Sequence, residues 1–264
     1  MSTSGPRTLP PDARPSWRRR RLDRDHSLGL RLTLASAAAF LVLVPFSLLA
    51  LLVLASSSPL HRWDATVTDA LHGWALDRPG WTRFLIVWTD VFGPMPLRAA
   101  ALVLVIWLVR RQARRLALWV ATTMVVGGLL GPLLKLLVGR HRPDLLDPVA
   151  RAAGFAFPSG HALNATLAAG VLVMVFLPYA RRPVQRAALW GTALVLLLLT
   201  GFSRVALGVH WTSDVVGGWL LGVAVVAATT AAFTTWRHHV GLPSVRVTRD
   251  GVDPGEGDEP TRVG

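Results

Sequence analysis

Residues 116–138 read LALWVATTMVVGGLLGPLLKLLV, an apolar stretch that holds a single charged residue, Lys135. A helix needs roughly 20 predominantly apolar residues to cross the hydrocarbon core of a bilayer. This stretch has that length, and Lys135 is its only charged residue. It predicts a membrane-spanning helix that carries one cation near its C-terminal end.

Five further apolar stretches have similar length and composition, so we expect an all-α, polytopic membrane protein, a bundle of about six transmembrane helices. An additional apolar stretch from Phe84 to Phe92 either extends the second span or lies at the membrane interface. The membrane domain is expected to cover residues 30–238. The polar segments 1–29, which is basic, and 239–264 show no apolar periodicity and are expected to be disordered tails. The other five spans are expected at about 32–55, 94–109, 162–178, 187–202 and 212–235.

Composition supports the same class of protein. Hydrophobic residues make up 52% of the chain and charged residues 16%, whereas a soluble domain carries roughly 25% charged residues. The net charge of +13 would suit a nucleic-acid partner, but the basic residues gather at the ends of apolar stretches, so we expect no nucleic acid. The chain has no cysteine, which excludes disulfides and thiolate-bound metal.

The basic residues also predict an orientation. With six crossings, both tails and the loops near 110–115 and 179–186 share one side, which holds 19 Lys and Arg residues against 8 on the other. Arg98 falls inside the second span. The positive side is cytoplasmic. We therefore expect a plasma-membrane protein with both termini in the cytoplasm and with loops 56–83, 136–161 and 203–211 facing outward.

Three short strings are all expected at this outer face, and three of their basic residues are expected to be aimed at one place. They are KLLVGRHRP at 135–143, PSGH at 158–161 and SRVALGVHWTSD at 203–214. Lys135 and Arg142 lie seven residues apart, on one face if the helix continues, and Arg204 is the third cation. Unpaired cations at a membrane boundary are costly, and a phosphate satisfies three of them through charge-assisted contacts. Asp144 and Asp147 are the nearby carboxylates, and we expect them to pair with the loop arginines.

Ser159 and Gly160 open the fourth span. The free N–H groups and the positive end of a helix form a seat for phosphate there. In the third string, His210 and Asp214 lie four residues apart, so on a helix the carboxylate holds the imidazole with one nitrogen free. A neutral, oriented histidine is a nucleophile for phosphorus. His161 then has a separate task, the donation of a proton to the leaving oxygen.

These strings resemble the type 2 phosphatidic acid phosphatase family, also called lipid phosphate phosphatases. The family pattern is Lys, six residues, Arg-Pro; then Pro-Ser-Gly-His; then Ser-Arg, five residues, His, three residues, Asp. Every fixed position of this pattern is matched. The resemblance implies His210 as nucleophile, Asp214 as the residue that orients it, His161 as general acid, and neither cofactor nor metal. It implies a phosphate site made by Lys135, Arg142, Ser159, Gly160 and Arg204.

The function expected from the sequence is hydrolysis of a lipid phosphate in the membrane, through a phosphohistidine. Phosphatidate, phosphatidylglycerol phosphate and a polyprenyl mono- or diphosphate all fit as the substrate. The alternative is a transporter or binding protein for anionic lipids or phosphates. His141 and Trp211 lie inside the strings without a fixed place in the pattern, and both substrate contact and plain packing stay open for them.

Overall fold

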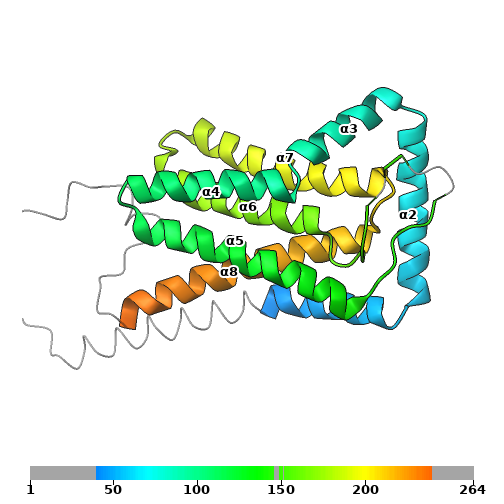
Figure 1. Cartoon of the computed structure of the whole chain (residues 1–264), viewed down its shortest axis with the longest axis horizontal. Coiled ribbons are helices and arrows are strands. Elements are labelled where there is room, and N and C mark those ends of the chain that lie inside the picture. The colour runs from blue at the N-terminus through cyan, green and yellow to red at the C-terminus, as the bar shows by residue number, and fades with distance from the viewer. Residues whose placement is uncertain (1–39, 146–148, 151, 240–264) are drawn as a thin grey trace, which may run out of the picture.

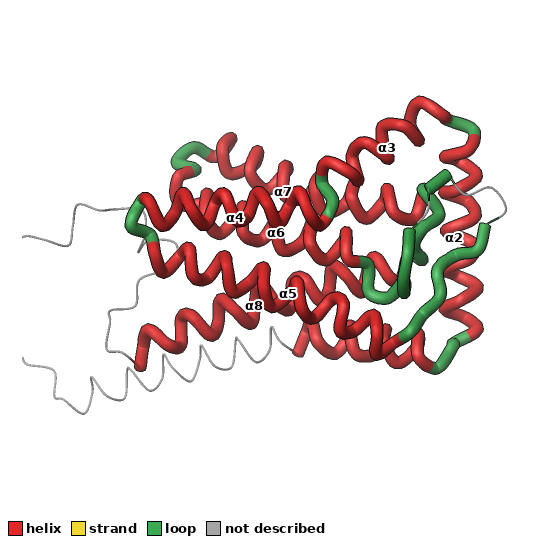
Figure 2. The backbone as a smooth tube through the Cα atoms, viewed as in Figure 1, coloured by secondary structure: helices red, strands yellow, loops and turns green. Residues whose placement is uncertain are grey.

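The computed structural model describes residues 40–145, 149–150 and 152–239, with side chains up to residue 233. The expectation of disordered tails therefore falls almost entirely outside the described residues. Within them every regular element is a helix and none is a strand, which confirms the all-α class (Figure 2). The helices are Phe40–Leu54, α2 (Ser58–Leu76), α3 (Pro79–Val91), α4 (Pro94–Arg110), α5 (Arg114–Val138), α6 (Gly160–Phe176) with the 3-10 turn η2 (Leu177–Tyr179), α7 (Pro183–Ala206) and α8 (Thr212–His239).

The expected membrane spans are found as helices. Among the described residues, α5, α6 with η2, α7 and α8 are each long and apolar enough to cross a bilayer, and two bent helix pairs bring the number to as many as six. One pair is α3 with α4, bent by 42°, so the apolar stretch at 84–92 forms an oblique helix in front of the second span. The chain is thus a multi-pass membrane protein.

The other bent pair departs from expectation. Residues 56–83 were expected to be a loop, yet they form α2 and the start of α3. The helix Phe40–Leu54 meets α2 at 95°, and α2 lies across one end of the bundle (Figure 1). The buried side chains of α2 are Asp64, Thr68, His72 and Ala75, which recur every three or four residues and so mark one face of a helix. This face covers the end of the bundle.

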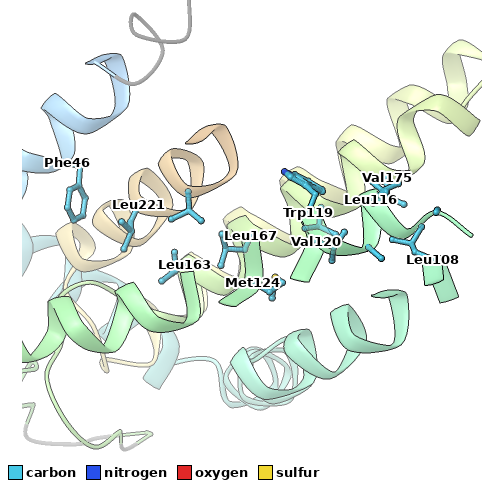
Figure 3. Packing of buried hydrophobic residues seen from close by; sticks show 14 of the residues in the cluster. Phe46, Leu108, Leu116, Trp119, Val120, Met124, Leu163, Leu167, Val175 and Leu221 are labelled. Atoms are coloured by element: carbon cyan, nitrogen blue, oxygen red, sulfur yellow. The ribbon is translucent and has the colours of Figure 1, made fainter. Parts of the chain in front are cut away.

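Helix α6 occupies the middle of the bundle, where it contacts α4, α5, α7 and α8. Ten of its 17 residues are buried, so nearly its whole circumference is apolar and packed. Leu163 and Leu167 of α6 belong to the main hydrophobic cluster together with Trp119 of α5 and Leu221 of α8 (Figure 3). A helix enclosed in this way holds the PSGH segment at its N-terminus in a fixed position.

Small residues allow this close packing. A methyl group on Gly127 or Gly131 of α5 would overlap Leu167 or Leu163 of α6. Gly218 and Gly222 of α8 lie equally close to α6, at Ala162 and Thr166. The small-xxx-small spacing visible in both spans therefore marks helix contacts.

The order of the helices brings distant strings together. The turns after α4 and after η2 lie at one end of the bundle, and the segments after α5 and α7 lie at the other, under α2 (Figures 1 and 2). All three strings that hold the candidate site residues are therefore at the end that α2 covers.

Candidate functional site

Each string takes its position from a helix end. Helix α5 ends at Val138 because Gly139 adopts a left-handed conformation (φ 64°) that suits glycine. Lys135 thus lies in the last turn of α5, while Arg142 lies in the loop that follows. Arg204 lies in the last turn of α7, and the link to α8 carries His210.

The structure corrects two geometric expectations. The helix does not continue from Lys135 to Arg142, so these two cations do not share a helical face, and the turn at Gly139 brings Arg142 to the site instead. His210 also precedes the first residue of α8, Thr212, so it does not share a helix with Asp214. The two side chains still meet, with 3.3 Å between Nδ1 of His210 and Oδ2 of Asp214.

Three cations, Lys135, Arg142 and Arg204, converge around His210 and are held by neutral groups. Nζ of Lys135 donates to the carbonyl of Phe155 at 2.7 Å, and Arg142 donates to the carbonyl of Val209 at 2.6 Å. Arg204 donates through Nη1 to Oγ1 of Thr89 at 2.9 Å. Among the described residues no carboxylate forms an ion pair with any of the three. Their positive charge is therefore oriented but not neutralised.

The contacts of His210 define its tautomer. Nη1 of Arg142 lies 3.1 Å from Nε2 of His210, and a guanidinium only donates, so Nε2 is an acceptor and carries no proton. Nδ1 then carries the proton and donates to Asp214, whose Oδ2 also accepts the N–H of Trp211 at 2.9 Å. The pair thus has the arrangement expected of an imidazole held by a carboxylate with one nitrogen exposed to a substrate.

Electrostatics keep this imidazole neutral. Complete burial, reinforced by the charges of Arg142, Arg204 and Lys135, holds the pKa of His210 well below its ordinary value. Burial also lowers the pKa of the Arg142 guanidinium, and the charge of Asp214 opposes that shift. At neutral pH the site therefore combines a neutral histidine with charged cations.

The N-terminus of α6 completes the group. Ser159 is the N-cap residue, and its side chain makes no capping hydrogen bond, so it does not occupy the first N–H groups of α6. Oγ of Ser159 and Nε of Arg204 are both buried, and neither has a hydrogen-bond partner among the described residues. Buried polar atoms are almost always paired. Two such donors beside a helix N-terminus indicate a site for an anion.

His161, the second residue of α6, faces this group. It interacts electrostatically with Arg204, His210, Lys135 and Arg142, which places it at the same site. On its other side is the junction between α3 and α4, where a methyl group on Gly93 would lie 3.5 Å from Nε2 of His161. The two histidines therefore flank the site of the anion from different elements.

Three residues that the sequence reasoning missed support Asp214. Arg140 donates to Oδ1 of Asp214 and to Oδ2 of Asp64, both at 2.7 Å, and to Oγ of Ser213 at 2.6 Å. Asp64 is fully buried in α2 and also accepts the N–H of Ser213 at 2.9 Å. Both carboxylates are thereby held by a single guanidinium, so α2 is linked through Arg140 to the carboxylate that contacts His210.

The expected carboxylate partners of the loop arginines were thus wrong for Arg140. Asp144 forms no ion pair with a described residue, and Asp147 lies outside the described residues. The observed partner, Asp64, lies some 76 positions earlier in the chain. Its signal in the sequence is an aspartate that shares a helical face with Thr68, His72 and Ala75.

A cavity of about 640 Å³ opens beside the site, between the start of α2 and the 140–144 loop. His141 and Trp211, whose roles the sequence left open, both line it, and the indole N–H of Trp211 donates to the carbonyl of His141 at 3.0 Å. Arg140 and Arg142 line it as well, so the cavity opens next to the three cations.

Comparison with known proteins points to one superfamily. Residues 116–238 match the model of the PAP2 superfamily. The chain is 38% identical over 98 residues to phosphatidylglycerophosphatase B of Bacillus subtilis (36% of this chain, 47% of that protein) and 29% identical over 122 residues to undecaprenyl-diphosphatase of Sulfolobus acidocaldarius (44% and 54%). It is 34% identical over 110 residues to lipid A 1-phosphatase of Rhizobium etli (38% and 43%). The chain spans about half the length of the curated relatives it matches.

A solved structure shares the fold. The crystal structure of a transmembrane PAP2 type phosphatidylglycerolphosphate phosphatase from Bacillus subtilis superposes with a TM-score of 0.61 at 25% identity, over 70% of this chain and 92% of that one. Fold and site together define a multi-pass membrane protein with a cationic site that contains two histidines. Residues 116–238 are similar to the PAP2 superfamily, which confirms the resemblance found in the three strings.

Proposed function

We propose that this protein is a membrane phosphatase that hydrolyses a lipid phosphate through a phosphohistidine intermediate. The observation that carries the proposal is the arrangement of His210: its Nε2 lone pair is free of a proton, and Asp214 and three uncompensated cations surround it. A transporter or a binding protein needs the cations but has no use for an oriented, neutral imidazole. The names of the relatives supply the class of substrate, lipid-linked phosphates.

In the first step, Nε2 of His210 attacks phosphorus and the bond from phosphorus to the leaving oxygen breaks. Arg142, which donates to Nε2 without substrate, transfers that hydrogen bond to a phosphate oxygen and so releases the lone pair. His161 donates its proton to the leaving oxygen, and the lipid alcohol or lipid phosphate departs. In the second step His161 accepts a proton from water, the hydroxide attacks the phosphohistidine, and inorganic phosphate leaves.

The remaining residues stabilise charge in these steps. Lys135, Arg142 and Arg204, with Oγ of Ser159 and the N–H groups that begin at Gly160, bind the phosphate oxygens. They are already oriented by main-chain carbonyls and by Thr89, so little reorganisation is needed at the moment of reaction. Asp214 stabilises the positive imidazole ring of the intermediate. Arg140 and Asp64 keep that carboxylate in place.

The test is phosphate release by the purified protein. We expect turnover of at least one of phosphatidate, phosphatidylglycerol phosphate and a polyprenyl diphosphate, with activity retained in excess EDTA. The described residues contain no group of three or more His, Cys, Asp or Glu side chains that could hold a metal ion. Vanadate should inhibit, because its trigonal-bipyramidal form resembles the transition state and binds the same cations. Activity lost in EDTA and restored by one divalent ion would refute the metal-independent mechanism.

We further propose that the protein lies in the plasma membrane with the site on the outer face and both termini in the cytoplasm, because the opposite end carries the excess of basic residues. Single cysteines in this cysteine-free chain test the orientation. Asp77, at the exposed end of α2, and Arg181, in the exposed turn before α7, lie at opposite ends of the bundle. On intact cells an impermeant thiol reagent should label Asp77→Cys and spare Arg181→Cys, and the reverse pattern would show an inverted topology.

A further inference from the structure

Arg98 is a cation that neither the family pattern nor the proposed steps use. It lies in α4, one turn after the helix begins, within a stretch that is otherwise apolar. A charged side chain inside a membrane span is costly, and proteins retain one where it meets a partner or serves a function. The family-model match begins at residue 116, so Arg98 falls outside it.

Contacts link Arg98 to the turn that opens α6. Its Nε donates to Oδ1 of Asn164 at 3.0 Å, and Nδ2 of Asn164 donates to the carbonyl of Gly160 at 2.8 Å. Gly160 and Asn164 are four residues apart on α6, about 6 Å along the helix axis at 1.5 Å per residue. The guanidinium therefore lies about one helical turn from the proposed phosphate seat, on the side away from α2.

The rest of the guanidinium is open. Among the described residues no carboxylate forms an ion pair with Arg98, and its two Nη nitrogens donate no hydrogen bond. Gly128 of α5 faces the guanidinium: a methyl group there would lie 3.8 Å from Nη2. Because this glycine has no side chain, the guanidinium packs against the backbone of α5 with room for about a methyl group between them.

The direction of attack places the leaving group on this side. In-line displacement by His210 sends the leaving oxygen to the opposite face of the phosphate, toward His161. Gly93, whose added methyl would come 3.5 Å from His161, is the N-cap residue of α4, five residues before Arg98. A leaving group that passes His161 and turns into the bilayer therefore meets Arg98 as its next cation.

We infer that Arg98 binds a second phosphate of the substrate, one that the lipid product retains. This rests on the proposed phosphatase function and narrows its substrate class to lipids with two phosphates, the scissile one and one on the leaving group. A polyprenyl diphosphate carries the second phosphate next to the broken bond, and phosphatidylglycerol phosphate carries it beyond a glycerol. Phosphatidate has no such group, so it leaves the Arg98 charge without an anion.

The experiment compares kcat/KM of the full-length protein and of Arg98→Met on phosphatidate, phosphatidylglycerol phosphate and a polyprenyl diphosphate. Methionine keeps the length of the side chain and suits a membrane helix, so folding is favoured. We expect the preference for at least one two-phosphate lipid over phosphatidate to fall by about 10- to 100-fold, the loss typical of a hydrogen bond to a charged group. Arg98→Lys should recover part of the preference. The two-phosphate lipid whose kcat/KM falls in Arg98→Met shows which distance between the two phosphates suits Arg98.

Arg110→Met is the matched control, because Arg110 is exposed at the far end of the same helix, and it should leave the ratio as in the parent protein. Equal losses on all three lipids for Arg98→Met would overturn the inference and show that Arg98 supports the Gly160 turn through Asn164. A parent protein that prefers phosphatidate would overturn it as well. Absence of phosphate release from every lipid by the parent protein would instead contradict the proposed function.

Discussion

His210→Ala should reduce turnover of every phosphate ester to background, a loss of about 10⁵- to 10⁶-fold where the nucleophile is removed. The reason is that His210 is the imidazole whose Nδ1 contacts a carboxylate and whose Nε2 accepts from Arg142 and so carries no proton, whereas the cations only donate. The loss should be equal for lipid and aryl phosphates, because the identity of the leaving group cannot compensate for a missing nucleophile. Steady-state release of inorganic phosphate measures it.

The control is His61→Ala, an exposed histidine of α2 that lines the cavity and packs its ring against Trp211 at 5.3 Å. Its activity should stay within about threefold of the parent, as for surface substitutions away from a site. Asp214→Asn should show a smaller defect than His210→Ala, because it disturbs the tautomer and leaves the imidazole in place. Residual turnover by His210→Ala with a trapped phosphoenzyme would show that another residue is the nucleophile.

The sequence predicts the parts of the fold that depend on a single continuous stretch of residues. Five of the six spans appear as helices within a few residues of the expected bounds, and the first is described from Phe40 onward, because about 20 apolar residues have few alternatives in a bilayer. The site residues come together for a related reason. Three strings at the same ends of antiparallel helices must meet once the helices pack.

The parts that were missed depend on contacts between distant residues. Helix α2 has no long apolar stretch, since it lies across the bundle and needs only one buried face, so a search for spans passes over it. Its Asp64 reaches Arg140 only after the chain turns by 95° at the end of the first helix. The main-chain partners of Lys135 and Arg142 could not be predicted from the sequence either, because they depend on the path of the loop at 153–155.

His161→Ala should lose activity in a different pattern from His210→Ala. The contribution of a general acid to the rate is larger when the leaving group is more basic. A lipid alkoxide needs the proton, and removal of a general acid typically costs about 10²- to 10⁴-fold. A p-nitrophenolate leaves well without it, so the first phosphoryl transfer from p-nitrophenyl phosphate should keep most of its rate. The same variant lacks the base that activates water, so the phosphohistidine should then persist.

The measurement is therefore a rapid-mixing assay of His161→Ala with p-nitrophenyl phosphate. We expect a burst of one p-nitrophenolate per protein, followed by slow turnover, and a phosphoryl group trapped on His210. The parent protein is the control and should show little accumulation, because its His161 faces the same phosphate and serves both steps. If the burst is slowed as much as the lipid reaction, His161 does not protonate the leaving oxygen. If the trapped group in the parent protein sits on His161, the two histidines exchange roles.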